Sequence, residues 1–378
     1  MTTNALSVRP IVVYGASGYT GTMIAKELHS RGVRVVLGGR DANALRRVAN
    51  ELGPDVVVRA ASVGDGASLR ALVAGCSVVV NAAGPFSVTG RPLLEAALSS
   101  GSHYVDIGAD PFVMQSFFDE YDDEAQRVGS AVLAGASFYF MLSDLLAHRL
   151  SEGHGILESI DVAYALDRWN FTPGSLTALW DMVGKRLEYV GGSLRPTAAR
   201  AALSTFAFSD PTGAQVVFAY PGGDVVTIPR HVSANNVTVS MSAKTFAPSW
   251  SFKAVPAFLR ALQVVSRSWL GPVLRRLSAR LPRRDLEARR ATTRFTVEVH
   301  AEEQGKIRAA SIHGRHMYGL GAWLTADVAW RLSRGEVAAR GVLAPSQAFD
   351  AATYLAELAR HELIDEIATD DCVAHSPY

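Results

Sequence analysis

A glycine-rich turn near the N-terminus constrains the fold of this chain more than any other segment. The turn, Gly15-Ala16-Ser17-Gly18-Tyr19-Thr20-Gly21, follows the apolar run Ile11 to Tyr14 and opens a stretch with helical spacing. Glycines at these spacings permit a tight turn, a close approach of the backbone to a phosphate, and close helix packing. The pattern therefore predicts a strand, a dinucleotide-binding turn and a helix, the alternative being a similar turn that binds no ligand.

Short β-branched runs alternate with amphipathic stretches up to about residue 150, a pattern that predicts an α/β fold with a Rossmann-type doubly wound parallel sheet. The expected strands are 11–14, 34–37, 56–59, 77–81, 104–107 and 131–134, and the expected helices are 18–30, 42–51, 66–73, 92–99 and 111–128. Later strands are separated by turn signals such as Asp210-Pro211-Thr212-Gly213, which predict a second α+β domain with a mostly antiparallel sheet. Its expected strands are 159–165, 204–208, 215–220, 236–242, 293–300 and 308–313, and its expected helices are 175–187 and 256–281, followed by C-terminal helices at 318–332 and 346–358.

Composition excludes several other classes of protein. The 378 residues exceed what one core usually supports, and a net charge of +1 gives no overall attraction to nucleic acid. Two cysteines without metal-ligand spacing predict neither a disulfide framework nor a zinc site. The uncharged run from Ala71 to Gly90 is interrupted by glycine, proline and asparagine, so we expect no transmembrane span. Since the first ten residues show no targeting pattern, we expect a cytoplasmic protein.

The end of the second expected strand indicates which dinucleotide is bound. It carries Gly38-Gly39-Arg40 and lacks the acidic residue that would bond an unphosphorylated ribose. A guanidinium at Arg40 matches the 2′-phosphate of NADP, so we predict NADP (NADPH) as the cofactor. A solvated residue at a helix start is the alternative for Arg40.

Two further strand ends point to the same edge of the sheet. The segment Asn81-Ala82-Ala83-Gly84-Pro85-Phe86 has small residues that would let the chain approach the nicotinamide ring. The segment His103-Tyr104-Val105-Asp106-Ile107-Gly108 offers titratable side chains, either for chemistry or for bonding to the neighbouring backbone. The predicted cofactor-binding set is Gly15, Ser17, Gly18, Tyr19, Thr20, Gly39, Arg40, Asn81, Ala82, Gly84, Pro85 and Phe86.

With these segments, the chain resembles the saccharopine dehydrogenase-like oxidoreductases, which include the trans-acting enoyl reductases. The motifs that carry the resemblance are Tyr14 to Gly21, Gly39-Arg40, Val80 to Phe86, His103 to Asp106, Ser143-Asp144-Leu145 and Gly341 to Pro345. The resemblance implies a Rossmann NADP-binding domain at 1–150, an α+β substrate or dimerisation domain at 151–314, and C-terminal helices at 315–378 that return to the first domain. It also implies an oxidoreductase activity.

The chain departs from the family pattern at several positions. Ile107-Gly108-Ala109-Asp110 follows the motif at 103–106, so the usual acidic residue is shortened or shifted, and Leu142 replaces a proline. After the third strand the chain has Ala61-Ser62, with Asp65 close behind, and the C-terminal motif is His316 to Ala322. These departures favour a substrate different from those of the amino-acid enzymes of the family.

We predict an NADPH-dependent reductase that transfers hydride to a C=C or C=N bond of a biosynthetic intermediate. The candidate proton donors are Tyr104, His316 and Tyr318, although such side chains are also common as structural residues. A non-catalytic NADP-binding sensor or scaffold is the second hypothesis. A short-chain dehydrogenase is disfavoured because no Tyr-x-x-x-Lys pair stands in the expected region.

A basic segment suggests how partners are bound. Arg267 to Arg294 holds nine arginines and two acidic residues, with leucines at helical spacing. This helix either packs its leucine face on the domain or on a second subunit, or receives an acidic carrier protein, a coenzyme A phosphate or a membrane surface. We expect a small-molecule or carrier-bound substrate, no nucleic acid, and a homodimer.

Overall fold

The computed structural model divides the chain into two compact units. Unit 1 comprises Met1–Gly108, Val113–Phe138 and Tyr318–Leu343, and unit 2 comprises Ala109–Phe112, Tyr139–Met317 and Ala344–Tyr378. The structure describes residues 9–182, 186–197, 203–246, 251–252, 257, 261, 264–265, 268, 286–365 and 367–370. The domain ranges 1–150, 151–314 and 315–378 that the resemblance implies stay a prediction.

Unit 1 is built on a seven-stranded parallel sheet, here called sheet A, with the order β15-β6-β5-β4-β1-β2-β3. Its strands are β1 (Ile11–Tyr14), β2 (Val35–Gly39), β3 (Val57–Ala60), β4 (Val78–Asn81), β5 (His103–Asp106), β6 (Ala131–Leu133) and β15 (Gly341–Val342). Strands β1 and β4 are buried along their whole length, as strands between two helical layers must be. The predicted doubly wound parallel sheet is confirmed, and the strand order reverses between β1 and β4.

The helices that connect these strands agree with the expected pattern except in one place. They are α1 (Tyr19–Ser30), α2 (Ala42–Leu52), α3 (Gly66–Val73), α4 (Phe86–Ser99) and α5 (Pro111–Arg127). Helix α4 begins six residues before the predicted start at Pro92, which lies inside the helix. Proline usually marks the first turn of a helix, so the pattern placed the start too late. Among the described residues no helix is long and apolar enough to cross a membrane.

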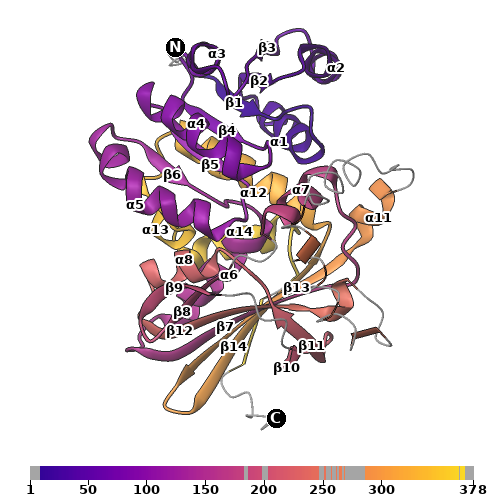
Figure 1. Cartoon of the computed structure of the whole chain (residues 1–378), viewed down its shortest axis with the longest axis vertical. Coiled ribbons are helices and arrows are strands. Elements are labelled where there is room, and N and C mark those ends of the chain that lie inside the picture. The colour runs from indigo at the N-terminus through magenta and orange to yellow at the C-terminus, as the bar shows by residue number, and fades with distance from the viewer. Residues whose placement is uncertain are drawn as a thin grey trace. The chain divides into compact units, whose positions relative to one another are not determined.

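A helix from the C-terminal part of the chain completes unit 1. Helix α12 (Met317–Ser333) packs on α1 through Asp327, which forms an ion pair of 2.7 Å with Arg31 at the end of α1. The Arg31 guanidinium also lies 4.8 Å from the ring centre of Trp323. Figure 1 shows α12 in orange among the indigo and purple elements of unit 1.

Unit 2 contains a nine-stranded mixed sheet, here called sheet B, with the order β10-β11-β12-β7-β13-β14-β16 and the pair β8-β9 attached to β12. Its strands are β7 (Leu157–Leu166), β8 (Arg186–Val190), β9 (Ser193–Thr197), β10 (Leu203–Ala207), β11 (Ala214–Ala219), β12 (Ala234–Ser242), β13 (Arg294–Glu303), β14 (Lys306–Arg315) and β16 (Ala368–Asp370). Among the strand pairs of sheet B that the structure describes, only that of β12 with β7 is parallel. The predicted α+β fold with a mostly antiparallel sheet is therefore confirmed, and Figure 1 shows its long central strands β7, β13 and β14 side by side.

The remaining elements belong to unit 2 or join the units along the chain. They are α6 (Phe138–Ser151), α7 (Pro173–Met182), α8 (Asp224–Thr227), η1 (Ile228–Arg230), η2 (Ala243–Thr245), α11 (Leu286–Thr292), α13 (Pro345–Ala348) and α14 (Ala351–Arg360). The helix predicted at 175–187 was too long, because α7 ends at Met182 and strand β8 begins at Arg186. The helix predicted at 256–281, and most of the basic segment Arg267 to Arg294, lie outside the described residues.

Candidate cofactor-binding site

The turn after β1 has a geometry that only glycine fits at two positions. Gly15 adopts φ +84°, and a Cβ there would lie 2.9 Å from Ala82 and Ala83. A Cβ on Gly21 would lie 2.2 Å from the Gly15 carbonyl oxygen, so this glycine lets the first turn of α1 pack on the loop itself. The backbone N–H of Gly18 donates to the same oxygen at 2.9 Å. The turn is thus closed tightly by its own backbone.

The first residues of α1 form the part of the turn that a ligand could reach. Gly18 is the N-cap and has no side chain to occupy the N–H groups that follow it, and the first turn contains no acidic residue. Ser17 is exposed, and Tyr19 and Thr20 are half-buried. Since the N–H groups of a helix's first turn and the helix dipole both favour negative charge, this end of α1 suits a phosphate.

Arg40 lies exposed directly after β2, at the same edge of sheet A. Asp41 caps α2, its carboxylate accepting from the backbone N–H of Asn43 at 2.9 Å and of Ala44 at 3.0 Å. The carboxylate next to Arg40 is therefore engaged with the helix. Burial raises the pKa of the Tyr14 hydroxyl, and the charge of Arg40 acts in the opposite direction. Gly38 of β2 pairs with Tyr14 of β1, so Arg40 follows β2 near the end of β1.

The segment after β4 is held by a buried amide. The Asn81 side chain is fully buried; its Nδ2 donates to Thr89 Oγ1 and to the Tyr104 hydroxyl, both at 3.1 Å. Its Oδ1 accepts from the backbone N–H of Ala83 at 3.0 Å. Ala82 and Pro85 are half-buried, Gly84 is exposed, and Phe86 is buried as the first residue of α4. Asn81 thereby fixes the loop that lies against Gly15.

Tyr104 belongs to the support of this loop. Its ring is fully buried, and its hydroxyl donates to Asp106 Oδ2 at 2.9 Å. Asp106 Oδ1 accepts from the backbone N–H groups of Gly108 and Gly135 at 2.9 and 2.8 Å. Burial raises the pKa of both the Tyr104 phenol and the Asp106 carboxyl. This surrounding favours a structural role for Tyr104 over proton donation to a substrate.

The structure brings Tyr318 next to the glycine-rich turn. Its ring, in the first turn of α12, meets the ring of Tyr19 edge-to-face, with 5.6 Å between the ring centres. Tyr318 is half-buried, so a face of the side chain is accessible. His316 belongs to unit 2, where it has φ +56° and its backbone N–H donates to the Thr293 carbonyl at 3.0 Å. Of the three candidate proton donors, only Tyr318 lies at the turn within unit 1.

The arrangement in unit 1 fits a dinucleotide. A glycine cradle, an uncapped helix start and an exposed arginine lie at the carboxyl edge of a parallel sheet, where its strand order reverses. The two acidic residues named above as departures from the family pattern bond to the backbone nearby. Asp65 caps α3 and accepts from the Ala67 N–H at 3.0 Å, and Asp110 accepts from the Phe112 N–H at 2.9 Å.

Residues 11–137 match the family model of the saccharopine dehydrogenase NADP binding domain. The matched residues include strands β1 to β6 of sheet A. The resemblance that the motifs predicted is thereby confirmed for the part of the chain that holds the glycine-rich turn. It supports a nicotinamide dinucleotide as the cofactor.

Relatives and solved structures extend the comparison. The chain is 30% identical over 145 residues to a trans-acting enoyl reductase of Mycobacterium tuberculosis, covering 37% of this chain and 35% of that protein. It is 30% identical over 163 residues to a lipid droplet localized protein of Caenorhabditis elegans, covering 40% and 38%. The chain spans at most half the length of the curated relatives it matches. The apo saccharopine dehydrogenase (L-Glu forming) of Saccharomyces cerevisiae shares the fold over 96% of this chain and 100% of its own, with a TM-score of 0.65 and 13% identity.

A buried cluster in unit 2 surrounds Asp144, which belongs to one of the motifs that carried the resemblance. Asp144 Oδ1 accepts from the backbone N–H and the hydroxyl of Ser346, at 2.9 and 2.7 Å, directly after the segment Gly341 to Pro345. His231 Nε2 lies 2.9 Å from the other carboxylate oxygen. Burial opposes ionisation, but His231 and Ser346 together hold the pKa of Asp144 below its usual value. Sequence reasoning did not find His231, since nothing in the pattern near it marks this role.

Proposed function

We propose that this protein is an NADPH-dependent reductase that acts on a C=C bond of an enoyl substrate. The geometry of the turn from Gly15 to Gly21 is the observation that carries the proposal. Its support comes also from the NADP-binding family model and from relatives named trans-acting enoyl reductase. The substrate is a small molecule or is held on a carrier.

The chain's own residues then have distinct tasks. The start of α1 would hold the pyrophosphate, Arg40 would hold the 2′-phosphate, and the loop from Ala82 to Phe86 would receive the nicotinamide. When bound, NADPH supplies the hydride that one carbon of the double bond receives. The other carbon takes a proton, for which we propose the Tyr318 hydroxyl because this side chain lies at the turn.

Cofactor choice is tested with Arg40→Ala. Removal of the guanidinium takes away its paired donors to the 2′-phosphate, so we expect the ratio of NADPH to NADH affinity to fall at least tenfold. Titration of nicotinamide fluorescence measures both affinities. Arg127→Ala, an exposed arginine on α5 in the same unit, is the control and should leave the ratio unchanged. An unaltered ratio in Arg40→Ala would assign that residue to the solvated surface.

Turnover is tested by oxidation of NADPH with an enoyl thioester and, in parallel, with a cyclic imine. We expect oxidation with the enoyl thioester, and a fall of roughly 100-fold in Tyr318→Phe with NADPH affinity preserved. Tyr121→Phe is the control, because its hydroxyl is bonded to Glu95 at 2.7 Å in the same unit. Turnover of the imine alone would change the substrate class. Tight NADPH binding without any turnover would favour a sensor, and an unchanged rate in Tyr318→Phe would remove this residue as proton donor.

A further inference from the structure

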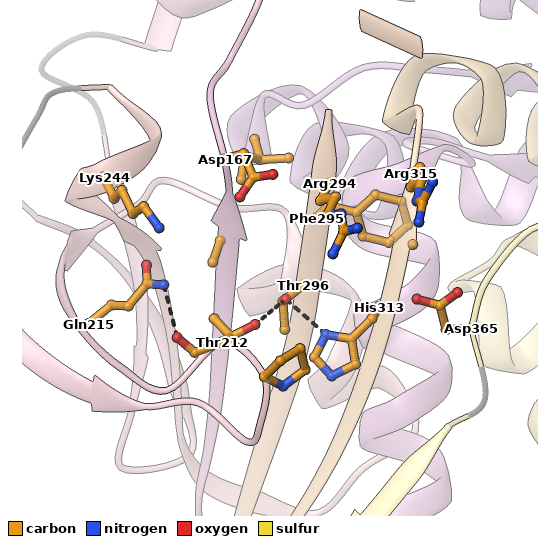
Figure 2. Close-up of a pocket in the computed structure, with 14 residues that line it drawn as sticks. Asp167, Thr212, Gln215, Lys244, Arg294, Phe295, Thr296, His313, Arg315 and Asp365 are labelled. Carbon is orange, nitrogen blue, oxygen red and sulfur yellow. Dashed lines mark hydrogen bonds between the residues drawn. The ribbon is translucent and has the colours of Figure 1, made fainter. Parts of the chain in front are cut away.

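Unit 2 contains a pocket of about 470 Å³ at one end of sheet B. Its walls are the last residues of β7, the first residues of β13, the last residues of β14 and the turn at Pro211 and Thr212. All of the residues that line it belong to unit 2. Figure 2 shows Lys244 on one side of this pocket and Arg294 and Arg315 on the other.

Like charges lie opposite each other on one wall. Arg294 and Arg315 are paired in register across β13 and β14, and both side chains are exposed. Two cations directly opposite on neighbouring strands destabilise a sheet. Within the described part of the chain, neither guanidinium forms an ion pair, and the same holds for Lys244. Repulsion at this wall would be relieved by an anion bound between the cations.

The pocket also contains acceptors. Asp167 and Asp365 line it, so its charged side chains are three cations and two carboxylates, an excess of one positive charge. Carboxylates beside a cationic wall would accept from O–H or N–H groups of a ligand whose acidic group faces the arginines. The excess of positive charge therefore favours a negatively charged head group.

A fixed chain of hydroxyl groups forms the polar floor. The Thr212 and Thr296 hydroxyls are 2.7 Å apart, and the Thr296 hydroxyl lies 3.0 Å from His313 Nδ1 (Figure 2). Thr296 is 5% exposed, so this chain is held by the sheet. Because these hydroxyl groups already form hydrogen bonds within the protein, the acidic group of a ligand would be bound by the arginines and Lys244.

An aromatic pocket of about 890 Å³ adjoins the charged one and shares Asp167, Thr212, Gln215 and Lys244 with it. Its lining includes Trp169 and Phe171, whose rings stack with 4.6 Å between centres, and Phe246, which is 38% exposed. Each volume lies in the range of small-molecule sites. An apolar wall beside a cationic one suits a ligand with an acidic head and an apolar body.

We propose that these joined pockets form a binding site for an amphipathic anion, a carboxylate or phosphate attached to an apolar chain. Arg294, Arg315 and Lys244 bind the acidic group, and the aromatic wall covers the chain. The sequence contains a signal for the paired arginines: a hairpin centred on Gln304-Gly305 places them opposite each other. The proposal goes beyond the reductase activity, since it concerns a second ligand, and its test measures binding without turnover.

The test is calorimetric titration of the whole protein with decanoate, decyl phosphate and inorganic phosphate. We expect a decyl probe to bind at least tenfold more tightly than inorganic phosphate, and comparison of the two decyl probes identifies the preferred acidic group. The double variant Arg294→Gln/Arg315→Gln should weaken that binding at least tenfold and should not strengthen the binding of the other probes. Arg195→Gln, an exposed arginine on β9 in the same unit, should bind like the parent.

Further variants keep the result interpretable. Arg294→Lys/Arg315→Lys retains the charge and should bind the probe if the double glutamine variant does not fold. Phe246→Ser should weaken decyl binding and leave inorganic phosphate unaffected. NADPH affinity, a property of unit 1, should be unaltered in all of them, so failure here is distinct from failure of the reductase proposal. Absence of binding by every probe, or equal binding by the parent and the double glutamine variant, would overturn the proposal.

Discussion

At the scale of single residues, the two neighbours His103 and Tyr104 have different surroundings on β5. Tyr104 is sealed in the interior with Asn81 and Asp106. His103 begins the strand, at the opposite end from the glycine-rich turn, and its Nδ1 accepts from the Ala131 backbone N–H at 3.0 Å. Burial, followed by the charges of Arg340 and Arg9, lowers the pKa of His103 to about 4. A proton on this imidazole therefore costs free energy in the folded state.

This pKa predicts a pH dependence of stability. Because the unfolded imidazole takes up its proton near its ordinary pKa of about 6.5, while the folded one does so near 4, stability is retained above pH 6.5 and lost as the pH falls towards 4. Between pH 7 and 4.5 the loss from His103 should be about 2 to 3 kcal/mol.

Urea unfolding at the two pH values measures this loss. His103→Asn keeps an acceptor for Ala131 and has no proton to gain, so its free energy of unfolding should fall by that much less than the parent's over the same interval. Other titrating groups are common to both proteins and cancel in the difference. Equal losses in parent and variant would contradict a lowered pKa of His103.

At the scale of elements, the pairing of α1 with α12 depends on one buried carboxylate. Asp327 is 3% exposed in its side chain and pairs at 2.7 Å with both Arg31 and Arg331. Arg31 is 16% exposed, and its guanidinium lies 4.8 Å from the ring centre of Trp323 and 5.7 Å from that of Trp330. Loss of one partner would leave a charge with little access to water.

We therefore predict that Asp327→Asn lowers the free energy of unfolding by about 3 kcal/mol, a typical cost for breaking a buried pair. Chemical denaturation followed by circular dichroism measures the change. Glu336→Gln is the matched control, since Glu336 pairs with Arg334 at 2.6 Å on the surface just after α12, and its loss should cost less than about 1 kcal/mol. A similar small effect in both variants would show that α12 does not depend on Asp327.

The elements themselves were largely predictable from the sequence. Strand β1 and helix α3 have the predicted bounds, and the hydrophobic spacing of α12 placed it within one residue at each end. These segments have a clear period and clear flanking signals. Strands β8 and β9 were missed because Leu187 and Tyr189 alternate over too short a distance beside a helical pattern, and their pairing with β12 is a long-range contact.

At the scale of the whole molecule, the chain alternates between its two units. Unit 1 is complete only with the segment Tyr318–Leu343, which supplies most of α12 and strand β15. Strand β15 pairs with β6 at the edge of sheet A. Unit 2 likewise gains the segment from Ala344, whose Ser346 bonds to Asp144. Each unit is therefore built from segments distant in sequence, which raises the contact order of the fold.

The sequence by itself determined the class of the fold, the position of the glycine-rich turn and the residues from which a cofactor site could be built, because these follow from local period and from backbone conformations that glycine permits. Tertiary structure decided which of them meet. It buried Tyr104, brought Tyr318 to Tyr19, and placed Lys244 in one pocket with Arg294 and Arg315. Such contacts join segments far apart in the chain, and their free energy depends on burial and packing that no local pattern of residues records.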